Sequence, residues 1–314
     1  AGLVLFALLA MVDYHLLGSL AGPIYVVALG LLAAVLVTGQ ASHGAQRWIN
    51  LGFFPLQPSE PAKLAVIIAL SKFVSDREDE MRRFRTVVIS LAMVAVPTIL
   101  TFAQPDLGTS LVFIAVWLSI AVVGRIRWRY LGLLFLGALA GTGFAWQLLQ
   151  EYQRRRLLIF LNPGQDPLGE GYNIIQAQIS VGSGEIWGRG FLSGTQSQLH
   201  FLRVQYADFI FSVLAEELGF VGAIVLLALF AGLAVRGMRI AATTREGFGR
   251  LLTVGVVTMI AFQVFVNVGM NTTLLPATGI PLPFISFGGS SLISVLMGLG
   301  IVESVAMRRK RFEP

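Results

Sequence analysis

Nine apolar runs, separated by short charged or glycine-rich connections, dominate this sequence of 314 residues. A helix needs about 20 apolar residues to cross a bilayer. The first run is short, and the third reaches that length only when polar Glu60 and Lys63 are included. The runs cover residues 1–12, 22–38, 62–74, 86–103, 109–124, 131–149, 209–235, 251–270 and 291–307. We therefore predict an all-α, polytopic membrane protein with a single transmembrane domain over residues 1–314.

The composition supports a membrane protein and excludes some kinds of active site. Only 13 % of the residues are charged, against about 25 % in soluble domains. The absence of cysteine excludes disulfides and thiolate chemistry, and the wide spacing of His15, His43 and His200 argues against zinc. A metal would be a hard divalent cation, Mg²⁺ or Mn²⁺, held by oxygens. No organic cofactor is predicted.

The basic residues predict the orientation. Although the net charge is +6, the cations cluster in short loops between apolar runs, which argues against a nucleic-acid partner. Four groups, 72–85, 125–129, 236–250 and 308–311, hold 16 of the 23 Lys and Arg residues. Alternation through nine spans places all four on one side, which the positive-inside rule identifies as cytoplasmic. The external segments are then 43–59, 104–108, 151–208 and 271–290.

The N-terminal run, 1–12, has no basic flank and does not resemble a signal peptide. An odd number of spans leaves residue 1 outside and the C-terminus inside. We therefore expect a further helix to precede the first one seen here.

The first external segment leads into Glu60 and Lys63, which are spaced i, i+3 and so share a helix face. An ionisable pair at the edge of the hydrocarbon is costly unless the two neutralise each other or line a wet cavity. The alternative is an acidic first turn with a snorkelling lysine.

Two further external motifs carry charge. Asp106, in QPDLGTS, follows a helix-breaking proline and is either functional or a helix cap. Three consecutive arginines, Arg154, Arg155 and Arg156, oppose the charge rule and suit a phosphate ligand. A segment resting on lipid headgroups is the alternative for the arginines.

The long external segment, 150–208, ends at Asp208, where the apolar run 209–235 begins. This position places a carboxylate near one membrane face with access to water. Helical periodicity extends a stripe of small residues from it, through Ser212, Ala215, Gly219 and Gly222. The stripe permits close helix packing or leaves room for a substrate. Helix capping is the simpler explanation of Asp208.

The last external segment, 271–291, contains three prolines and three glycines and cannot form a continuous helix. Broken segments of this kind are tolerated at membrane depth where they line protein or water, and they also occur in transporters.

Together these motifs resemble the SEDS family (shape, elongation, division and sporulation), over nearly the whole chain. They occur in the family's order: GAQRWI with QPSE, QPDLGT, NPGQDPLGEGY, GRGFLSGTQSQL, ADFIFSVLAEELGF and PATGIPLPFISFGGSS. GTQSQL favours the elongation branch over the division branch. The family has ten spans with both ends cytoplasmic, so the helix missing here would be its first.

The resemblance implies an activity and a location. Members of this family polymerise lipid II into peptidoglycan glycan strands at the outer face of the bacterial cytoplasmic membrane. They work with a class B penicillin-binding protein as the transpeptidase. For the elongation branch, the resemblance also implies a role in cell elongation and shape maintenance together with the elongation machinery.

The resemblance also implies residue roles. It makes Asp208 the essential catalytic carboxylate and Glu60 and Lys63 the family's helix-borne polar pair. We expect Asp208 to act as a general base in an inverting displacement. The candidates for substrate binding are Arg47, Glu60, Lys63, Asp106, Arg154, Arg155, Arg156 and Ser290. A lipid II flippase and a non-catalytic scaffold for a cell-wall synthase are the competing hypotheses.

Overall fold

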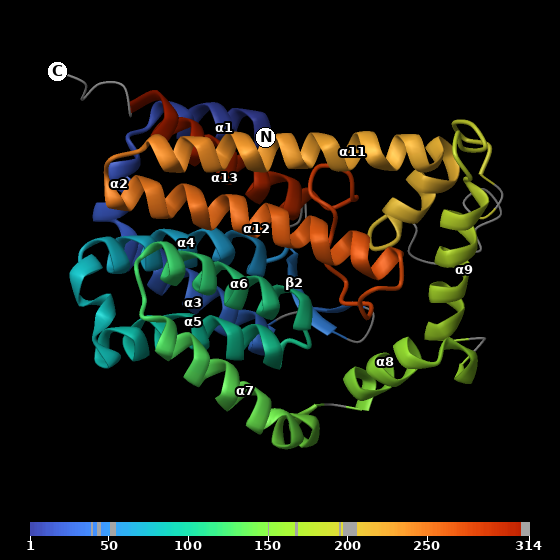
Figure 1. Cartoon of the computed structure of the whole chain (residues 1–314), viewed down its shortest axis with the longest axis horizontal. Coiled ribbons are helices and arrows are strands. Elements are labelled where there is room, and N and C mark those ends of the chain that lie inside the picture. The colour runs from blue at the N-terminus through green and yellow to red at the C-terminus, as the bar shows by residue number, and fades with distance from the viewer. Residues whose placement is uncertain are drawn as a thin grey trace. The chain divides into compact units, whose positions relative to one another are not determined.

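The computed structural model describes residues 1–38, 40–42, 45–50, 55–149, 151–166, 169–194, 196 and 206–308. Within these residues each predicted apolar run coincides with a helix (Figure 1). The helices are α1 (Gly2–Met11), α3 (Ala21–Thr38), α4 (Ser59–Ser75), α5 (Phe84–Ala103), α6 (Leu107–Val123), α7 (Trp128–Leu148), α11 (Ile210–Thr243), α12 (Gly247–Asn271) and α13 (Gly289–Arg308). The predicted all-α, multi-pass fold is confirmed.

Four of the described helices, α5, α11, α12 and α13, are long and apolar enough to cross a membrane, judged by length and composition alone. Shorter apolar helices cover Gly2–Met11, Ala21–Val37, Leu107–Val123 and Trp128–Gly141. The chain divides into two compact units. Unit 1 comprises residues 1–127, 233–262 and 288–314, and unit 2 comprises residues 128–232 and 263–287.

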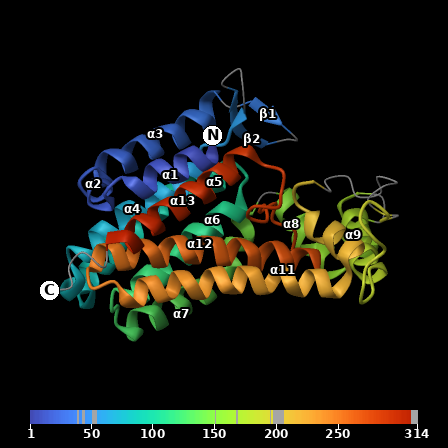
Figure 2. The same ribbon diagram turned by 90° about the horizontal axis from the view of Figure 1, so that it is seen from above.

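The core of unit 1 forms around α4, which is buried along most of its length, including every residue from Ala62 to Leu70. The two ends of the chain also pack together, because α1 lies along α13 in both views (Figures 1 and 2). A Cβ added at Gly300 would lie 2.6 Å from the carbonyl oxygen of Phe6. A glycine is therefore required where these helices approach each other.

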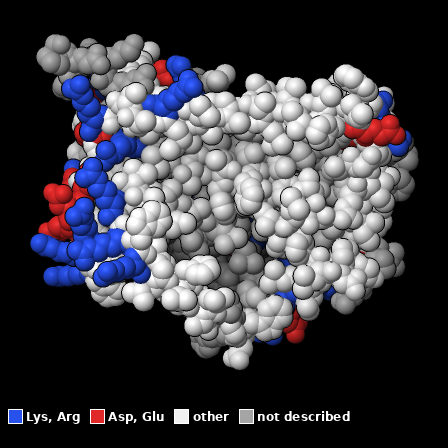
Figure 3. Space-filling model, viewed as in Figure 1, with Lys and Arg blue, Asp and Glu red and all other residues white. Residues whose placement is uncertain are grey.

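The cationic loops of unit 1 lie together at one end. Glu78, in the short helix η1 (Glu78–Arg82), forms ion pairs with Arg125 at 3.4 Å and with Arg250 at 2.9 Å. Three of the predicted cytoplasmic groups therefore lie side by side. Figure 3 shows Lys and Arg crowded at this end, where α2 (Tyr14–Ser19) also lies.

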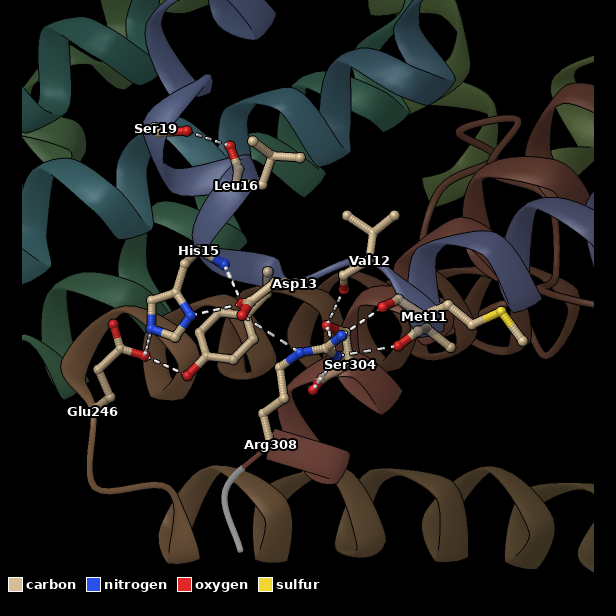
Figure 4. A network of polar contacts seen from close by, with 11 residues as sticks. Met11, Val12, Asp13, His15, Leu16, Ser19, Glu246, Ser304 and Arg308 are labelled. Atoms are coloured by element: carbon tan, nitrogen blue, oxygen red, sulfur yellow. Dashed lines mark hydrogen bonds and ion pairs between the residues drawn. The ribbon is translucent and has the colours of Figure 1, made fainter. Parts of the chain in front are cut away.

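A network of polar contacts ties the chain ends together at the same end of unit 1 (Figure 4). Arg308 donates to the carbonyl oxygens of Ala10 and Met11, which lie at the C-terminus of α1. Asp13 contacts Arg308 at 3.6 Å and His15 at 2.6 Å, and the second ring nitrogen of His15 lies 3.2 Å from Glu246.

A small antiparallel sheet, which the sequence analysis did not predict, lies between α3 and α4 in the chain. Its strands are β1 (Gln40–Ser42), β2 (Ala45–Asn50) and β3 (Pro55–Leu56), in the order β1-β2-β3. Ile49 of β2 pairs with Leu56 of β3, and β1 pairs with residues 45–48 of β2. Figure 2 shows β1 and β2 beyond the end of α3.

Unit 2 contains helices inside the long segment predicted as an external loop. They are α8 (Glu151–Leu161), η2 (Pro163–Gln165) and α9 (Glu170–Ser183). The buried residues of α9 recur every third position, at Gly171, Ile174, Ala177 and Ser180, so one face of this helix is buried although the segment is polar in composition.

The helix α11 is not continuous, and the predicted stripe of small residues is interrupted. Gly219 has φ 69° and ψ −169°, which breaks the helix between Leu218 and Phe220. The break exposes main-chain groups, and the turn formed by residues 184–190 binds them. Arg189 and Gly190 donate to the carbonyl oxygens of Glu216 and Glu217 at 2.9 and 3.0 Å, and Phe220 and Val221 donate to those of Glu185 and Ile186 at 2.9 and 3.1 Å.

Candidate functional site

Asp208 lies in the turn that precedes α11, which begins at Ile210. Asp208 therefore precedes an apolar helix, as the sequence analysis predicted. The carboxylate lies close to the 272–288 segment, since a Cβ added at Gly279 would be 3.7 Å from its Oδ2 atom. Gly279 has φ 73°, a conformation that favours glycine. The segment that the prolines and glycines predict to be non-helical therefore forms one side of the site.

A pocket of about 130 Å³ opens beside this carboxylate. It is lined by Arg156, Ile159, Asn173, Ile174, Asp208, Phe209, Ala277 and Gly279. The volume is below the roughly 300 Å³ at which pockets for whole small ligands begin. The pocket therefore fits the reacting part of a larger substrate.

The pocket is lined by two residues of opposite charge and by apolar side chains. Asp208 and Arg156 are the charged residues among those lining it, and Ile159, Ile174 and Phe209 are buried at 3, 7 and 5 % exposure. Apolar walls lower the local dielectric constant and strengthen the interaction of both charges with a bound substrate.

The three consecutive arginines do not act together. Arg154 donates to the carbonyl oxygens of Trp146 and Gln147 at 2.9 and 2.8 Å, at the C-terminal turn of α7. Arg155 forms an ion pair with Asp166 at 2.7 Å. Of the three, Arg156 is the one that lines the Asp208 pocket.

Sequence reasoning missed Asn173, on α9, as a member of the pocket. Its Oδ1 atom is buried and finds no hydrogen-bond partner among the residues that the structure describes. A buried acceptor without a partner costs free energy.

In unit 1, the predicted pair of Glu60 and Lys63 forms a salt bridge. The lysine Nζ and the glutamate Oε1 lie 2.8 Å apart, and each side chain is 2 % exposed. A snorkelling lysine is therefore excluded. Glu60 also occupies the first turn of α4, where a negative charge is favourable.

Two other predicted residues of unit 1, Asp106 and Ser290, both contact Gln57, which sequence reasoning did not select. Its side-chain amide lies 3.5 Å from Asp106, and its main-chain N–H donates to Ser290 Oγ at 3.1 Å. Ser290 also donates to Pro55 O at 3.2 Å. Arg47 donates to the carbonyl oxygens of Gln104, at 3.0 Å, and Pro105. These contacts join the sheet to the starts of α6 and α13.

Asp106 caps α6, accepting from the N–H of Thr109 at 3.1 Å and from its hydroxyl at 2.9 Å. The capping explanation is therefore confirmed for this carboxylate. The contacts of Arg47 and Ser290 hold the local fold, and their predicted contact with a substrate stays a prediction.

The carboxylates do not form a preformed metal centre among the described residues, where no group of three or more His, Cys, Asp or Glu side chains comes together. Mg²⁺ commonly binds through one or two carboxylates plus substrate phosphates. Asp208, the carboxylate that lines the pocket, fits a cation bound in that way.

Comparisons with known proteins cover almost the entire chain. The family model for FtsW, RodA and SpoVE, described as a cell cycle protein, matches residues 1–311. Peptidoglycan glycosyltransferase MrdB of Escherichia coli K12 is 42 % identical over 98 % of this chain and 84 % of its own length. Stage V sporulation protein E of Bacillus subtilis is 38 % identical over 97 % of this chain and 84 % of its own.

Solved structures of similar sequence also match almost the entire chain. A chain from a peptidoglycan synthase complex, in a study of how polymerization and crosslinking are coordinated, superposes with a TM-score of 0.84. It is 36 % identical, and the match covers 98 % of this chain and 87 % of that one. The rod shape determining protein RodA of Thermus thermophilus gives a TM-score of 0.73 at 33 % identity, over 100 % of this chain and 85 % of that one.

Proposed function

Because the chain belongs to the FtsW, RodA and SpoVE family of cell cycle proteins, we propose that it is a peptidoglycan glycosyltransferase that polymerises lipid II. The observation that carries the proposal is that Asp208 and Arg156 line the same pocket, which has apolar walls. A carboxylate beside a cation is what a displacement needs when a proton leaves the nucleophile and negative charge develops on the leaving group.

In the proposed reaction, a sugar hydroxyl of one lipid-linked substrate attacks the anomeric carbon of another. Asp208 accepts the hydroxyl proton as the new C–O bond forms. The bond from the anomeric carbon to the lipid pyrophosphate breaks, and its electron pair leaves with the pyrophosphate. Arg156 stabilises the charge on that leaving group through its bidentate guanidinium. A single displacement inverts the anomeric centre.

A divalent cation, Mg²⁺ or Mn²⁺, would bind here mainly through the pyrophosphate oxygens. Such an ion would neutralise charge on the leaving group. Asn173, whose side-chain oxygen lacks a partner among the described residues, would accept a hydrogen bond from a substrate hydroxyl or amide.

The charge pattern and the relatives support the cellular setting that we propose. We place the cationic loops on the cytoplasmic side of the bacterial inner membrane, because short loops rich in Lys and Arg remain there. The Asp208 pocket then faces the external side. The similar chain of known structure belongs to a peptidoglycan synthase complex, which supports a class B penicillin-binding protein as the transpeptidase partner during elongation.

The decisive experiment measures glycan strands formed from labelled lipid II by the purified chain with its transpeptidase partner and a divalent cation. Asp208→Asn should lower the rate by roughly 10²- to 10⁴-fold, the usual contribution of a general base. Asp166→Asn is the matched control, because it removes a carboxylate of the same unit that pairs with Arg155 outside the pocket. It should leave the rate nearly unchanged.

Two outcomes would contradict the proposal. Equal rates from Asp208→Asn and the native chain, with the partner's own activity excluded, would assign the base to another residue. No strands from the native chain, in a preparation shown to be folded, would favour a flippase or a scaffold.

A further inference from the structure

We propose that Asn267 and Asn271, one turn apart on α12, are positioning residues that aim the Asp208 carboxylate into its pocket. The proposal rests on the function proposed above for Asp208. It assigns a chemical task to two polar side chains within a helix that is otherwise apolar enough to cross a membrane.

Both amides bind the main chain of Asp208 itself. Asn271 Nδ2 donates to the carbonyl oxygen of Asp208 at 2.9 Å, and Asn267 Nδ2 donates to the same oxygen at 3.2 Å. Both asparagines are fully buried. Because a carbonyl oxygen has two lone pairs, the two amides saturate it, and the peptide group that follows Asp208 is held in one orientation.

The same side chains connect this peptide group to its surroundings. Asn271 Oδ1 accepts from both the N–H and the hydroxyl of Ser212, at 3.2 and 2.6 Å, in the first turn of α11. Asn267 Nδ2 also donates to the carbonyl oxygen of Ile280 at 2.8 Å, next to Gly279 on the pocket wall. The pair therefore joins the Asp208 turn, the start of α11 and the wall of the pocket.

The main-chain carbonyl groups of the two residues that precede Asp208 are also held by hydrogen bonds. The carbonyl oxygen of Ala207 accepts from the Ser286 hydroxyl at 2.6 Å, and that of Tyr206 accepts from the N–H of Phe287 at 2.8 Å. Ser286 Oγ in turn accepts from the N–H of Leu282 at 2.8 Å. Three consecutive carbonyl groups are thus bound, so the main chain from 206 to 208 cannot rotate without breaking hydrogen bonds.

Because the main chain from 206 to 208 is held, the position of the Asp208 carboxylate depends on the two torsions of its own side chain. A general base must lie within hydrogen-bond reach of the proton that it accepts, and an error of about 1 Å in position can cost roughly 10²-fold in rate. Asparagine supplies the donor and the acceptor that the turn and the helix start require. An apolar residue of the same volume at either position would leave the Asp208 carbonyl oxygen with one donor in place of two.

The experiment compares Asn267→Ala and Asn271→Ala with the native chain, Asp208→Asn and the control Gln263→Leu, each purified with the transpeptidase partner. Gln263 lies one turn earlier on α12, is 1 % exposed, and has an Oε1 atom without a hydrogen-bond partner among the described residues. It therefore matches the asparagines in burial and polarity but makes no hydrogen bond to the Asp208 turn among the described residues.

The readout is the initial rate of glycan bond formation as a function of lipid II concentration, which separates kcat from KM. Loss of positioning should lower kcat by roughly 10²-fold and leave KM nearly unchanged, because the residues do not line the pocket. Gln263→Leu should keep the native kcat. Ser286→Ala, which removes one half-buried donor, should lower kcat less and keeps the test decisive if an asparagine variant does not fold.

The two hypotheses fail in different ways. If Asp208→Asn retains full activity, the role proposed for Asp208 as the general base fails. If Asp208→Asn is inactive while the folded asparagine variants and Ser286→Ala keep the native kcat, the positioning proposal alone is overturned. It is also overturned if the variants raise KM without lowering kcat, or if Gln263→Leu lowers kcat equally.

Discussion

Lys63 and Glu60 form an ion pair on α4 in which the lysine Nζ lies 2.8 Å from the glutamate Oε1, and both side chains are 98 % buried. Every neighbour from Ala62 to Leu70 is buried as well. The second oxygen of Glu60 finds no hydrogen-bond partner among the described residues. The carboxylate thus depends on one lysine for its compensation.

We predict that Lys63→Met destabilises the protein strongly, because it leaves a buried carboxylate without a counter-charge. Removing one partner of a buried pair typically costs about 3–5 kcal/mol. The double variant Glu60→Gln with Lys63→Met should recover part of this loss, because no charge is left buried. Unfolding in detergent, followed by a spectroscopic probe, measures the difference.

The exposed pair of Lys72 and Asp76 is the matched control for this prediction. It has a similar distance, 2.7 Å, but its side chains are 41 and 46 % exposed. Lys72→Met should cost at most about 1 kcal/mol. An equally small cost for Lys63→Met would show that water reaches the buried pair.

Asp13 provides a pH-dependent prediction at the cationic end of unit 1 (Figure 4). The N–H of His15 hydrogen-bonds to the Asp13 carboxylate and, with the His15 side chain and Arg308, holds the pKa of that carboxyl below 3.8. Since the folded pKa is lower than the unfolded one, the stabilisation is present above about pH 4 and is lost as the pH falls through the folded pKa.

The variant Asp13→Asn keeps an oxygen that can accept from His15 but removes the charge. At about pH 5 we expect its midpoint of thermal unfolding to be lower by up to about 3 °C, since a half-exposed pair contributes at most about 1 kcal/mol. Once the pH lies below the folded pKa of Asp13, the two proteins should unfold together. A difference that grows as the pH falls would contradict the sign of this pKa shift.

Hydropathy predicted every helix that coincides with an apolar run, because the length of a run and the charge of its flanks are local properties of the sequence. The break at Gly219 was missed for the same reason. The run 209–235 is apolar on both sides of this glycine, and the hydrogen bonds that stabilise the break come from residues 184–190. A partner that is distant in sequence leaves no signal in hydropathy.

The candidate site could be predicted in part. Asp208 was identified because it ends a polar segment and matches a family motif, and Glu60 with Lys63 because their spacing places them on one face. The three arginines were grouped because they are adjacent, although successive residues of a helix point about 100° apart. Asn267 and Asn271 were missed because their meaning comes from contacts with a turn some 60 residues away, at Asp208.

We predict that Gly219→Ala disrupts unit 2 and lowers activity. The combination of φ 69° and ψ −169° is essentially restricted to glycine, and residues held in sparsely populated regions cost about 1–3 kcal/mol. The added Cβ would also lie 2.2 Å from the N atom of Gly188. The loss should therefore exceed the strain alone, and activity should fall because the first half of α11 carries the Asp208 turn.

Gly232→Ala, on the same helix, is the matched control for this prediction. Its Cβ would meet no heavy atom within 4 Å. Alanine has the higher helix propensity, by about 1 kcal/mol, so the variant should be as stable as the native chain or more so. Equal stability of the two glycine variants would mean that the break at Gly219 can straighten without loss.

Arg156 should bind the leaving group, and the structure separates it from its two neighbours. We predict that Arg156→Ala lowers glycan synthesis by roughly 10²-fold, similar to the loss of one donor that stabilises developing charge. Arg156→Lys should recover only part of the rate, because lysine keeps the charge but not the planar fork. Arg155→Ala is the control, because Arg155 pairs with Asp166 and does not line the pocket. A larger loss in Arg155→Ala than in Arg156→Ala would place the pyrophosphate on the other side of α8.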